Sequence, residues 1–363
     1  MTGPRGRLVE MIRHSGVRLS PELAAAFARV PREAFVPDGF QRRDGTWLMP
    51  ADKGFLDTVY QDDVLVTKVD GRVPTSSSSQ PSLMALMITE LDVHAGQRVL
   101  EIGAGTGYNA ALLASLGAEV VSIDVQADVA DRARSALARA GIAGVRVEQG
   151  DGYEGFPSVR FDRVIVTVGI TGISPRWLAQ LHPDGLIIAP VEHAGFHPVH
   201  AVRADGDRVT ATVVSPSGFM VAAGPLTAGH PEAFPHPAGT LTGLAEYAGP
   251  RFAEPLDGSA YRDLWYAAGV WHRRATHAAL PPREQACLVL LDEPRTGGAV
   301  ILPDGAVLAG GDDADVYATD AVAVLDRWLA AGRPPMSAWR VGLTLAGDRD
   351  APIWVPREWE LPT

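Results

Sequence analysis

VLEIGAGTGY, residues Val99–Tyr108, is the stretch that decides the fold of this 363-residue chain. It begins inside an apolar run, RVLEI (98–102), of the kind that forms a buried strand, and a helical pattern follows it to Leu116. The turn between strand and helix contains three glycines, Gly103, Gly105 and Gly107. Because glycine lets a backbone pass close to a ligand, the stretch predicts a binding turn at the end of a strand.

The spacing of these glycines disfavours a dinucleotide as the ligand. A dinucleotide-binding turn requires its third glycine one place after Gly107, where this chain has Tyr108. Glu101, at the lip of the turn, would repel a pyrophosphate but suits the amino group and sulfonium of S-adenosylmethionine. Asp124 ends the next strand, 21 residues after Gly103, where a carboxylate can bind both ribose hydroxyls. Nicotinamide enzymes use the same contact, so Asp124 indicates a nucleoside without choosing between the two cofactors.

Strands and helices alternate through the middle of the chain. Strands are predicted at 98–102, 119–124, 145–149, 162–168 and 186–191, with helices between them. This order predicts an α/β fold, in which a parallel sheet is covered by helices on both faces. Two further strand-like runs, near 197–202 and 208–214, flank an Asp-Gly-Asp turn and predict a closing hairpin.

Composition divides the chain into four parts. Residues 1–75 are predicted to be a helical and irregular segment of the binding domain, with helix over 8–31, and residues 76–223 to be its ligand-binding core. Residues 224–240 are dense in Gly, Pro and His and predict a linker. Residues 241–363 have helical and strand-like runs of their own, which predict a small α/β accessory domain.

Charge and composition exclude several kinds of partner. A formal net charge of −11 disfavours nucleic acids and anionic membranes. The N-terminal residues lack the apolar core of a signal peptide and no run approaches about 18 apolar residues, so a cytoplasmic protein is expected. His193, His197 and His200 do not share one face of a strand, so no metal is expected there. Cys287, the one cysteine, lies in an apolar run and is expected to be buried.

Several motifs in order along the chain closely resemble the protein-L-isoaspartate O-methyltransferase family. The main ones are VLEIGAGTGYNAALLA (99–114), GDGYEGFPSVRFDRVIVTVG (150–169) and LHPDGLIIAPV (181–191). Upstream, VPREAFVP (30–37) looks like the N-terminal signature of that family, and SSSSQP (76–81) stands where the family has a Thr-Ile-Ser-x-Pro substrate loop. The resemblance extends from about residue 20 to 222.

The resemblance implies a fold and a set of site residues. The fold is that of a class I S-adenosylmethionine-dependent methyltransferase, a Rossmann-like sheet of seven mostly parallel strands with one antiparallel. The residues implied to bind the cofactor are Glu101, Gly103, Ala104, Gly105 and Gly107 at the methionine part, Asp124 and Val125 at the ribose, and Asp151 and Gly152 at the adenine. Those implied to bind substrate are Ser77, Ser78, Ser79 and Gln80, with Ser78 and Ser79 as the catalytic pair.

The implied reaction is methylation of a carboxylate in a peptide or protein. Two departures from the family resemble its branch that modifies ribosomally made peptides, such as lanthipeptides, lasso peptides and graspetides. The loop reads Ser77-Ser78-Ser79 in place of Thr-Ile-Ser, and about 120 residues follow the predicted linker. We therefore expect an aspartate side chain of a modified peptide to be methylated, leading through a methyl ester to aspartimide or isoaspartate. General isoaspartyl repair remains the alternative, and a nicotinamide oxidoreductase or cofactor-binding scaffold is a third hypothesis.

Overall fold

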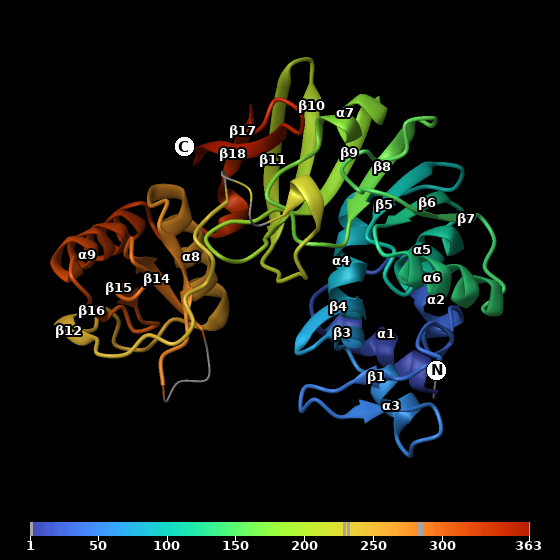
Figure 1. The fold of residues 1–363 in the computed structure, drawn as a ribbon, viewed down its shortest axis with the longest axis horizontal. Coiled ribbons are helices and arrows are strands. Elements are labelled where there is room, and N and C mark those ends of the chain that lie inside the picture. Colours follow the sequence, from blue (N-terminus) through green and yellow to red (C-terminus); the bar gives the residue numbers. More distant parts are fainter. Residues whose placement is uncertain (1–2, 228–229, 231–232, 282–285, 363) are drawn as a thin grey trace.

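The computed structural model describes residues 3–227, 230, 233–281 and 286–362. A large sheet and its helices form one part of the molecule, and a smaller body with α8 and α9 lies beside it (Figure 1). No helix among the described residues is long and apolar enough to cross a membrane.

The large sheet has nine strands in the order β18-β17-β11-β10-β9-β8-β5-β6-β7. Five of them are mutually parallel: β5 (Arg98–Ile102), β6 (Glu119–Asp124), β7 (Val145–Gln149), β8 (Phe161–Val166) and β9 (Leu181–Pro190). The predicted hairpin is β10 (Val199–Asp205) and β11 (Arg208–Ser215), in which β10 runs opposite to both neighbours. These seven strands match the expected sheet with one reversed strand.

Two strands from the end of the chain extend this sheet. β17 (Arg340–Ala346) pairs antiparallel with β11, and β18 (Ile353–Glu360) pairs antiparallel with β17. The prediction that 241–363 forms one separate domain is therefore wrong for residues 340–360. Their backbone groups complete an edge of the large sheet, which would otherwise end at β11.

Except for β7 at the sheet edge, the parallel strands have consecutive buried residues, as their apolar runs predict. In β5, Val99 packs into one hydrophobic cluster, and Leu100 and Ile102 pack into the other. One face carries α4 (Pro81–Leu91), α5 (Tyr108–Ser115) and α6 (Ala127–Arg139). The opposite face carries α7 (Pro175–Gln180), whose Trp177 is fully buried.

The N-terminal segment contains two helices instead of the single one predicted over 8–31. α1 (Pro4–His14) and α2 (Pro21–Arg29) are separated at Gly16, whose φ is 89°. The Ser20 hydroxyl caps α2 by accepting from the Leu23 amide. After η1 (Arg32–Phe35) comes an antiparallel sheet in the order β2-β1-β3-β4, comprising β1 (Phe40–Gln41), β2 (Trp47–Leu48), β3 (Leu65–Asp70) and β4 (Val73–Ser78), with α3 (Phe55–Val59) beside it.

The smaller body is a five-stranded antiparallel sheet in the order β12-β16-β15-β14-β13, packed against two helices. Its elements are β12 (Ala245–Ala248), α8 (Gly258–Trp271), β13 (Ala275–Ala278), β14 (Cys287–Leu291), β15 (Gly298–Ile301), β16 (Val307–Gly310) and α9 (Ala314–Ala330), followed by η3 (Met336–Ala338). Cys287 is buried in β14, as expected.

The predicted linker is partly packed. It begins with η2 (Gly224–Leu226), and residues 228–229 and 231–232 lie outside the described part. Phe234 and Ala238 are buried, and the Ala238 amide donates to the carbonyl of His277. Ala238 is therefore attached to the smaller body, whereas Phe234 packs against His193, which follows β9.

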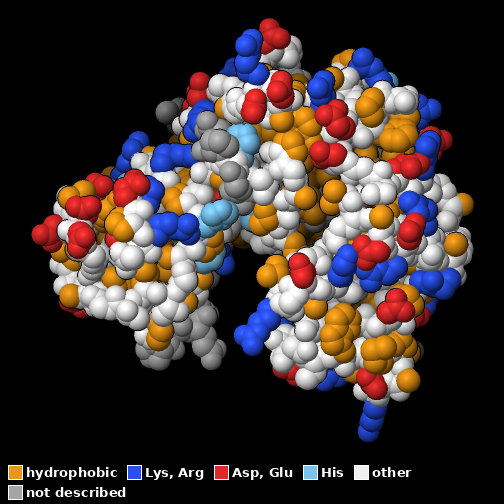
Figure 2. Space-filling view, viewed as in Figure 1, with side chains coloured by type: hydrophobic (Ala, Val, Ile, Leu, Met, Phe, Trp, Pro, Cys, Tyr) orange, Lys and Arg blue, Asp and Glu red, His pale blue; other side chains and the backbone are white. Residues whose placement is uncertain are grey.

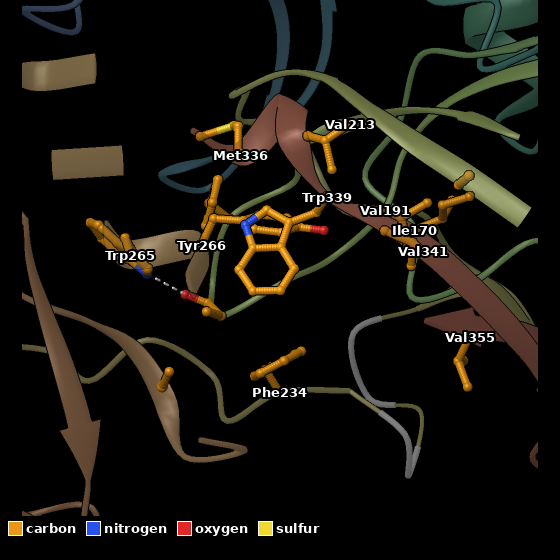
Figure 3. Close-up of a cluster of buried hydrophobic side chains, with 14 of the residues drawn as sticks. Ile170, Val191, Val213, Phe234, Trp265, Tyr266, Met336, Trp339, Val341 and Val355 are labelled. Atoms are coloured by element: carbon orange, nitrogen blue, oxygen red, sulfur yellow. Dashed lines mark hydrogen bonds between the residues drawn. The ribbon is translucent and has the colours of Figure 1, made fainter. Parts of the chain in front are cut away.

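A continuous apolar core joins the two parts of the molecule. Figure 3 shows Trp265 and Tyr266 of α8 packed with Trp339 and with side chains of the large sheet, such as Val213. The Trp265 indole donates to the carbonyl of Ala194 at 2.8 Å. Because this interface is packed like a protein interior, we expect the two parts to move together.

The three histidines at 193, 197 and 200 are buried and packed among other side chains. His193 stacks on Tyr266 with ring centroids 4.1 Å apart. Burial lowers the pKa of His193 to about 3 and that of His197 and His200 to about 4, so all three are neutral near pH 7. Among the described residues, no group of three or more His, Cys, Asp or Glu is arranged to hold a metal ion.

Gly269→Ala tests the close packing of α8. A glycine inside a helix normally costs roughly 0.5–1 kcal/mol relative to alanine, so this substitution would ordinarily stabilise. At Gly269, however, a Cβ would lie 2.3 Å from His193 Nε2, and we expect a loss of about 1–3 kcal/mol in the free energy of unfolding. Gly258, also in α8, has no atom within 4 Å of that position, so Gly258→Ala is the matched control in urea unfolding. Equal stabilisation of both variants would contradict the packing described here.

Candidate active site

A cavity of about 590 Å³ lies at the C-terminal ends of the parallel strands. This is where open α/β sheets commonly bind ligands. Its walls are residues 73–79, 102–106, 108–109, 123–126, 151–152, 167–168 and 219–223, together with Met84 and Leu226. β3 and β4, which lead into it, lie beside the hollow between the two parts of the molecule (Figures 1 and 2).

Two glycines of the turn, Gly103 and Gly105, lie so close to neighbouring residues that a side chain would be crowded. A Cβ on Gly103, whose φ is 96°, would lie 2.8 Å from Thr167 Oγ1. A Cβ on Gly105, whose φ is 51°, would lie 3.0 Å from the carbonyl oxygen of Ser77. Gly105 therefore lets the glycine turn approach residues 76–79, which we call the serine segment. The predicted reaction needs these two parts of the chain to lie close together.

Asp124 is fixed at the end of β6. Its Oδ2 accepts from the Gly105 amide at 3.1 Å and its Oδ1 from the Gln126 amide at 3.0 Å. The side chain is largely buried, and burial raises its pKa. Val125, the next residue, is 51% exposed although it lines the cavity, so an apolar surface is open to a ligand there.

Glu101 lies behind the cavity wall. It is fully buried and is not among the residues that line the cavity. Its Oε1 accepts from Asn109 Nδ2 at 2.7 Å and its Oε2 from Ser122 Oγ at 2.5 Å. Burial raises the pKa of Glu101 to about 7, against the lowering effect of these two hydrogen bonds. Glu101 therefore does not reach the cavity itself, but its hydrogen-bond partner Asn109 does.

Asn109 was missed by the sequence reasoning. It lines the cavity, and its Oδ1 is buried without a hydrogen-bond partner among the described residues. An acceptor oxygen backed by a buried carboxyl group suits a cationic donor, so these residues fit the amino group of S-adenosylmethionine. The sequence feature that could have identified Asn109 is its position in the first turn of α5, directly after the glycine turn.

The turn at Asp151 and Gly152 also reaches the cavity. Asp151 Oδ1 accepts from the Tyr153 amide at 2.9 Å, and the Gly152 carbonyl accepts from the Trp177 indole at 2.8 Å. A Cβ on Gly152 would lie 2.6 Å from Ile102 Cγ2. This glycine therefore permits close packing against the end of β5.

Burial alternates along residues 76–79, at the end of β4 and just beyond it, where the predicted substrate residues Ser77, Ser78 and Ser79 lie. Ser76 and Ser78 are 5% and 1% exposed, whereas Ser77 and Ser79 are half-buried. All four line the cavity, but the Ser78 hydroxyl accepts from Arg32 Nε at 3.4 Å. Gln80 is exposed, bonds to Asp62 and does not line the cavity.

Arg32, within VPREAFVP, anchors this segment. It is fully buried and donates from Nη1 to the carbonyls of Val59 (2.9 Å) and Gln61 (3.0 Å), and from Nη2 to those of Asp63 (2.9 Å) and Ser79 (3.0 Å). Burial lowers the pKa of Arg32 to about 10, so it stays charged near pH 7. Sequence reasoning noted the motif but missed this role.

Two further parts of the wall were not predicted. Residues 167–168 follow β8, and residues 219–223 lie beside them through a bridge between Gly169 and Val221. The Gly169 amide donates to the Met220 carbonyl, and the Ala222 amide donates to the Gly169 carbonyl. No local pattern in the sequence signals this pairing, because the partners are about 50 residues apart.

The sheet order and a cavity suited to a nucleoside with a cationic tail define a class I S-adenosylmethionine-binding methyltransferase. The sequence pattern of the family described as protein-L-isoaspartate(D-aspartate) O-methyltransferase matches residues 4–224. The chain therefore belongs to this family of S-adenosylmethionine-dependent carboxyl methyltransferases.

Two relatives are similar to this chain in sequence, and one solved structure is similar to it in fold. The protein-L-isoaspartate O-methyltransferase of Methanoculleus marisnigri is 37% identical over 189 residues, which are 52% of this chain and 76% of that protein. The protein of the same name from Thermotoga maritima is 37% identical over 191 residues, 52% of this chain and 55% of the relative. A solved structure described as a protein-L-isoaspartate O-methyltransferase has a similar fold over 96% of this chain and 98% of its own, with a TM-score of 0.56 and 24% identity.

Arg32→Lys tests the anchoring of the serine segment. Lysine keeps the charge but cannot reach the same carbonyls with a planar fork, so Ser79 loses its support. We expect kcat/KM for the peptide substrate to fall about tenfold or more, with affinity for S-adenosylhomocysteine within about twofold. Arg43→Lys is the control, since Arg43 is an exposed partner of Asp63. An unchanged kcat/KM in Arg32→Lys would contradict the anchoring role.

Glu101→Gln tests the burial of this carboxyl group. The folded protein holds a proton on Glu101 up to pH about 7, whereas the unfolded chain loses it near the ordinary value of 4.5. Stability contributed by this group is therefore present at low pH and lost as pH rises between these values, at about 1.4 kcal/mol per pH unit. We expect the difference in free energy of unfolding between wild type and Glu101→Gln to fall across this range in denaturant titrations without ligand. A difference independent of pH would show that Glu101 is not protonated in the folded state.

Proposed function

We propose that the chain methylates a carboxylate of a peptide or protein that is bound beside Ser77 and Ser79. The observation that carries this proposal is the meeting of the serine segment and the glycine turn in one cavity, with the Gly105 Cβ position 3.0 Å from the Ser77 carbonyl. The cavity is thus bordered on one side by the implied cofactor residues and on the other by the implied substrate residues.

The reaction requires positioning more than proton transfer. A side-chain carboxylate is ionised at neutral pH, since its ordinary pKa is about 4, so no general base is needed. S-adenosylmethionine supplies an electrophilic methyl group on its sulfonium, which becomes a thioether as the carboxylate becomes a methyl ester. Ser79, held by Arg32 through its carbonyl, would orient the carboxylate by donating a hydrogen bond. Such orientation can contribute on the order of 7–11 kcal/mol to lowering a barrier.

The finer proposal is that the acceptor is an aspartate in a ribosomally made, modified peptide. After methylation, the neighbouring backbone nitrogen attacks the ester carbonyl and methanol leaves, giving an aspartimide that water can open to aspartate or isoaspartate. The polar Ser77-Ser78-Ser79 loop supports this acceptor. The hollow between the two parts of the molecule gives room for a bulky peptide (Figure 2).

General repair of isoaspartyl residues is the second candidate. The named relatives are all described as protein-L-isoaspartate O-methyltransferases. One solved structure of that description covers nearly the whole of this chain in fold. The C-terminal extension alone therefore does not favour peptide modification over repair. The cytoplasmic location expected from the sequence stays a prediction.

Label transfer separates the two candidates. The protein is incubated with methyl-labelled S-adenosylmethionine and either a linear isoaspartyl peptide or a cyclic, modified peptide with one aspartate; matched peptides with asparagine at the acceptor are controls. Label on the aspartyl peptide, followed by labelled methanol and a product lighter by one water, supports peptide modification. Label on the isoaspartyl peptide alone rejects peptide modification in favour of repair, and label on neither rejects carboxyl methylation.

Ser79→Ala tests the placement of the acceptor carboxylate. Loss of a hydrogen bond to a charged group costs about 1.5–3 kcal/mol. We therefore expect kcat/KM for whichever peptide accepts the methyl group to fall at least tenfold. Affinity for S-adenosylhomocysteine, measured by calorimetry, should stay within about twofold. Ser135→Ala is the control, because Ser135 lies in α6 outside the cavity and its hydroxyl donates to the carbonyl of Asp131. If cofactor affinity falls in Ser79→Ala while peptide turnover at saturating cofactor does not, Ser79 belongs to the cofactor site instead.

A further inference from the structure

We propose that the β17–β18 hairpin, from the last part of the chain, positions the Asp151–Gly152 turn for cofactor binding. The inference rests on the proposed function, because it takes this turn as the adenine side of the cofactor site. None of the residues of β17, β18 or their connecting loop lines the cavity. The hairpin would therefore act through another residue, and Tyr153 makes that connection.

Tyr153 is held at three of its polar groups. Its hydroxyl donates to the carbonyl of Pro352, in the loop between β17 and β18, at 2.9 Å. Its amide donates to Asp151 Oδ1 at 2.9 Å, and its carbonyl accepts from Ser174 Oγ at 2.7 Å. The side chain is 2% exposed. One buried residue thus contacts the hairpin with its ring and the cavity-lining aspartate with its backbone.

The hairpin is fixed at the point of contact. The Ile173 amide donates to the Trp354 carbonyl at 2.9 Å, and the Trp354 amide donates to the Ile173 carbonyl at 2.8 Å. A Cβ on Gly172 would lie 2.6 Å from that Trp354 carbonyl, so the two backbones meet without an intervening side chain. Ile353 is fully buried. These contacts, together with the pairing of β17 to β11, make the hairpin a rigid support.

A rigid support matters because the turn itself is short and partly exposed. Asp151 is exposed, and its carboxylate is oriented by the Tyr153 amide. A loop that is already ordered in its binding conformation loses less entropy when the ligand binds. Residues behind a binding group commonly set its orientation in this way. Tyr153 is therefore a positioning residue, and loss of its hydroxyl should weaken cofactor binding without touching the cofactor.

Tyr153→Phe removes only the hydroxyl that reaches Pro352. By calorimetry on the full chain, we expect the Kd for S-adenosylhomocysteine to rise about three- to tenfold, the range for one lost hydrogen bond. KM for S-adenosylmethionine should rise similarly, while kcat at saturating cofactor stays unchanged. The control is Tyr261→Phe, because the Tyr261 hydroxyl also donates to a backbone carbonyl, that of Ile301, but within the smaller body. This control should lower thermal stability and leave the Kd unchanged.

Hydrogen exchange tests the coupling in the opposite direction. Because linkage is reciprocal, cofactor binding should stabilise the hairpin as much as the hairpin stabilises the bound cofactor. S-adenosylhomocysteine should therefore slow amide exchange in the 347–354 segment of wild type, and this protection should be reduced in Tyr153→Phe at saturating ligand.

The outcomes distinguish the inference from the proposed function. If wild type binds S-adenosylhomocysteine and Tyr153→Phe binds it equally well, the positioning role is wrong and the cofactor site stands. The same conclusion follows if Tyr261→Phe weakens binding as much as Tyr153→Phe, since the effect would then be one of general stability. If wild type binds no S-adenosylhomocysteine, the proposed cofactor site itself fails.

Discussion

The close approach of backbone at the end of β5 is the constraint on which the site depends. Gly103 packs against Thr167, where a Cβ would clash, and Gly105 packs against the Ser77 carbonyl, where a Cβ would be tightly crowded. One turn therefore joins three elements, β5, the segment after β8 and the serine segment. Because the serine segment is also held by Arg32 from the N-terminal part, the cofactor and substrate sides of the cavity share one rigid frame.

Burial of acidic groups gives this frame its preference for a cation. Glu101 and Asp124 both have raised pKa values because they are removed from water. A positively charged ligand nearby would favour their ionised forms and offset part of that cost. The arrangement suits a sulfonium and an ammonium group far better than a pyrophosphate, which would add negative charge beside two carboxyl groups. Electrostatics and glycine spacing thus lead separately to the same class of ligand.

Sequence patterns correctly predicted the structural features that depend on a few neighbouring residues. The apolar run at 98–102 predicted a strand and the Gly-rich turn predicted the start of a helix, and the structure has both there. Asn109 and Arg32 were missed because their roles arise from partners distant in sequence, such as Ser79 for Arg32. The direct contact expected between Glu101 and the cofactor requires the Glu101 side chain to face the cavity. Its orientation is set by hydrogen bonds from Asn109 and Ser122, which the local sequence pattern does not reveal.

The C-terminal residues show why the strands at the edge of a sheet are difficult to predict from sequence. β17 pairs with β11 across about 125 residues, and its alternation of buried and exposed positions would suit either sheet of the molecule. What selects the large sheet is the open edge of β11, together with the apolar contacts of Val341 and Trp339 at the joint. An insertion of a small body between β11 and β17 is then a more accurate description than an appended domain. In that topology the chain returns to the sheet that carries the cofactor turn, and this return brings Pro352 within reach of Tyr153.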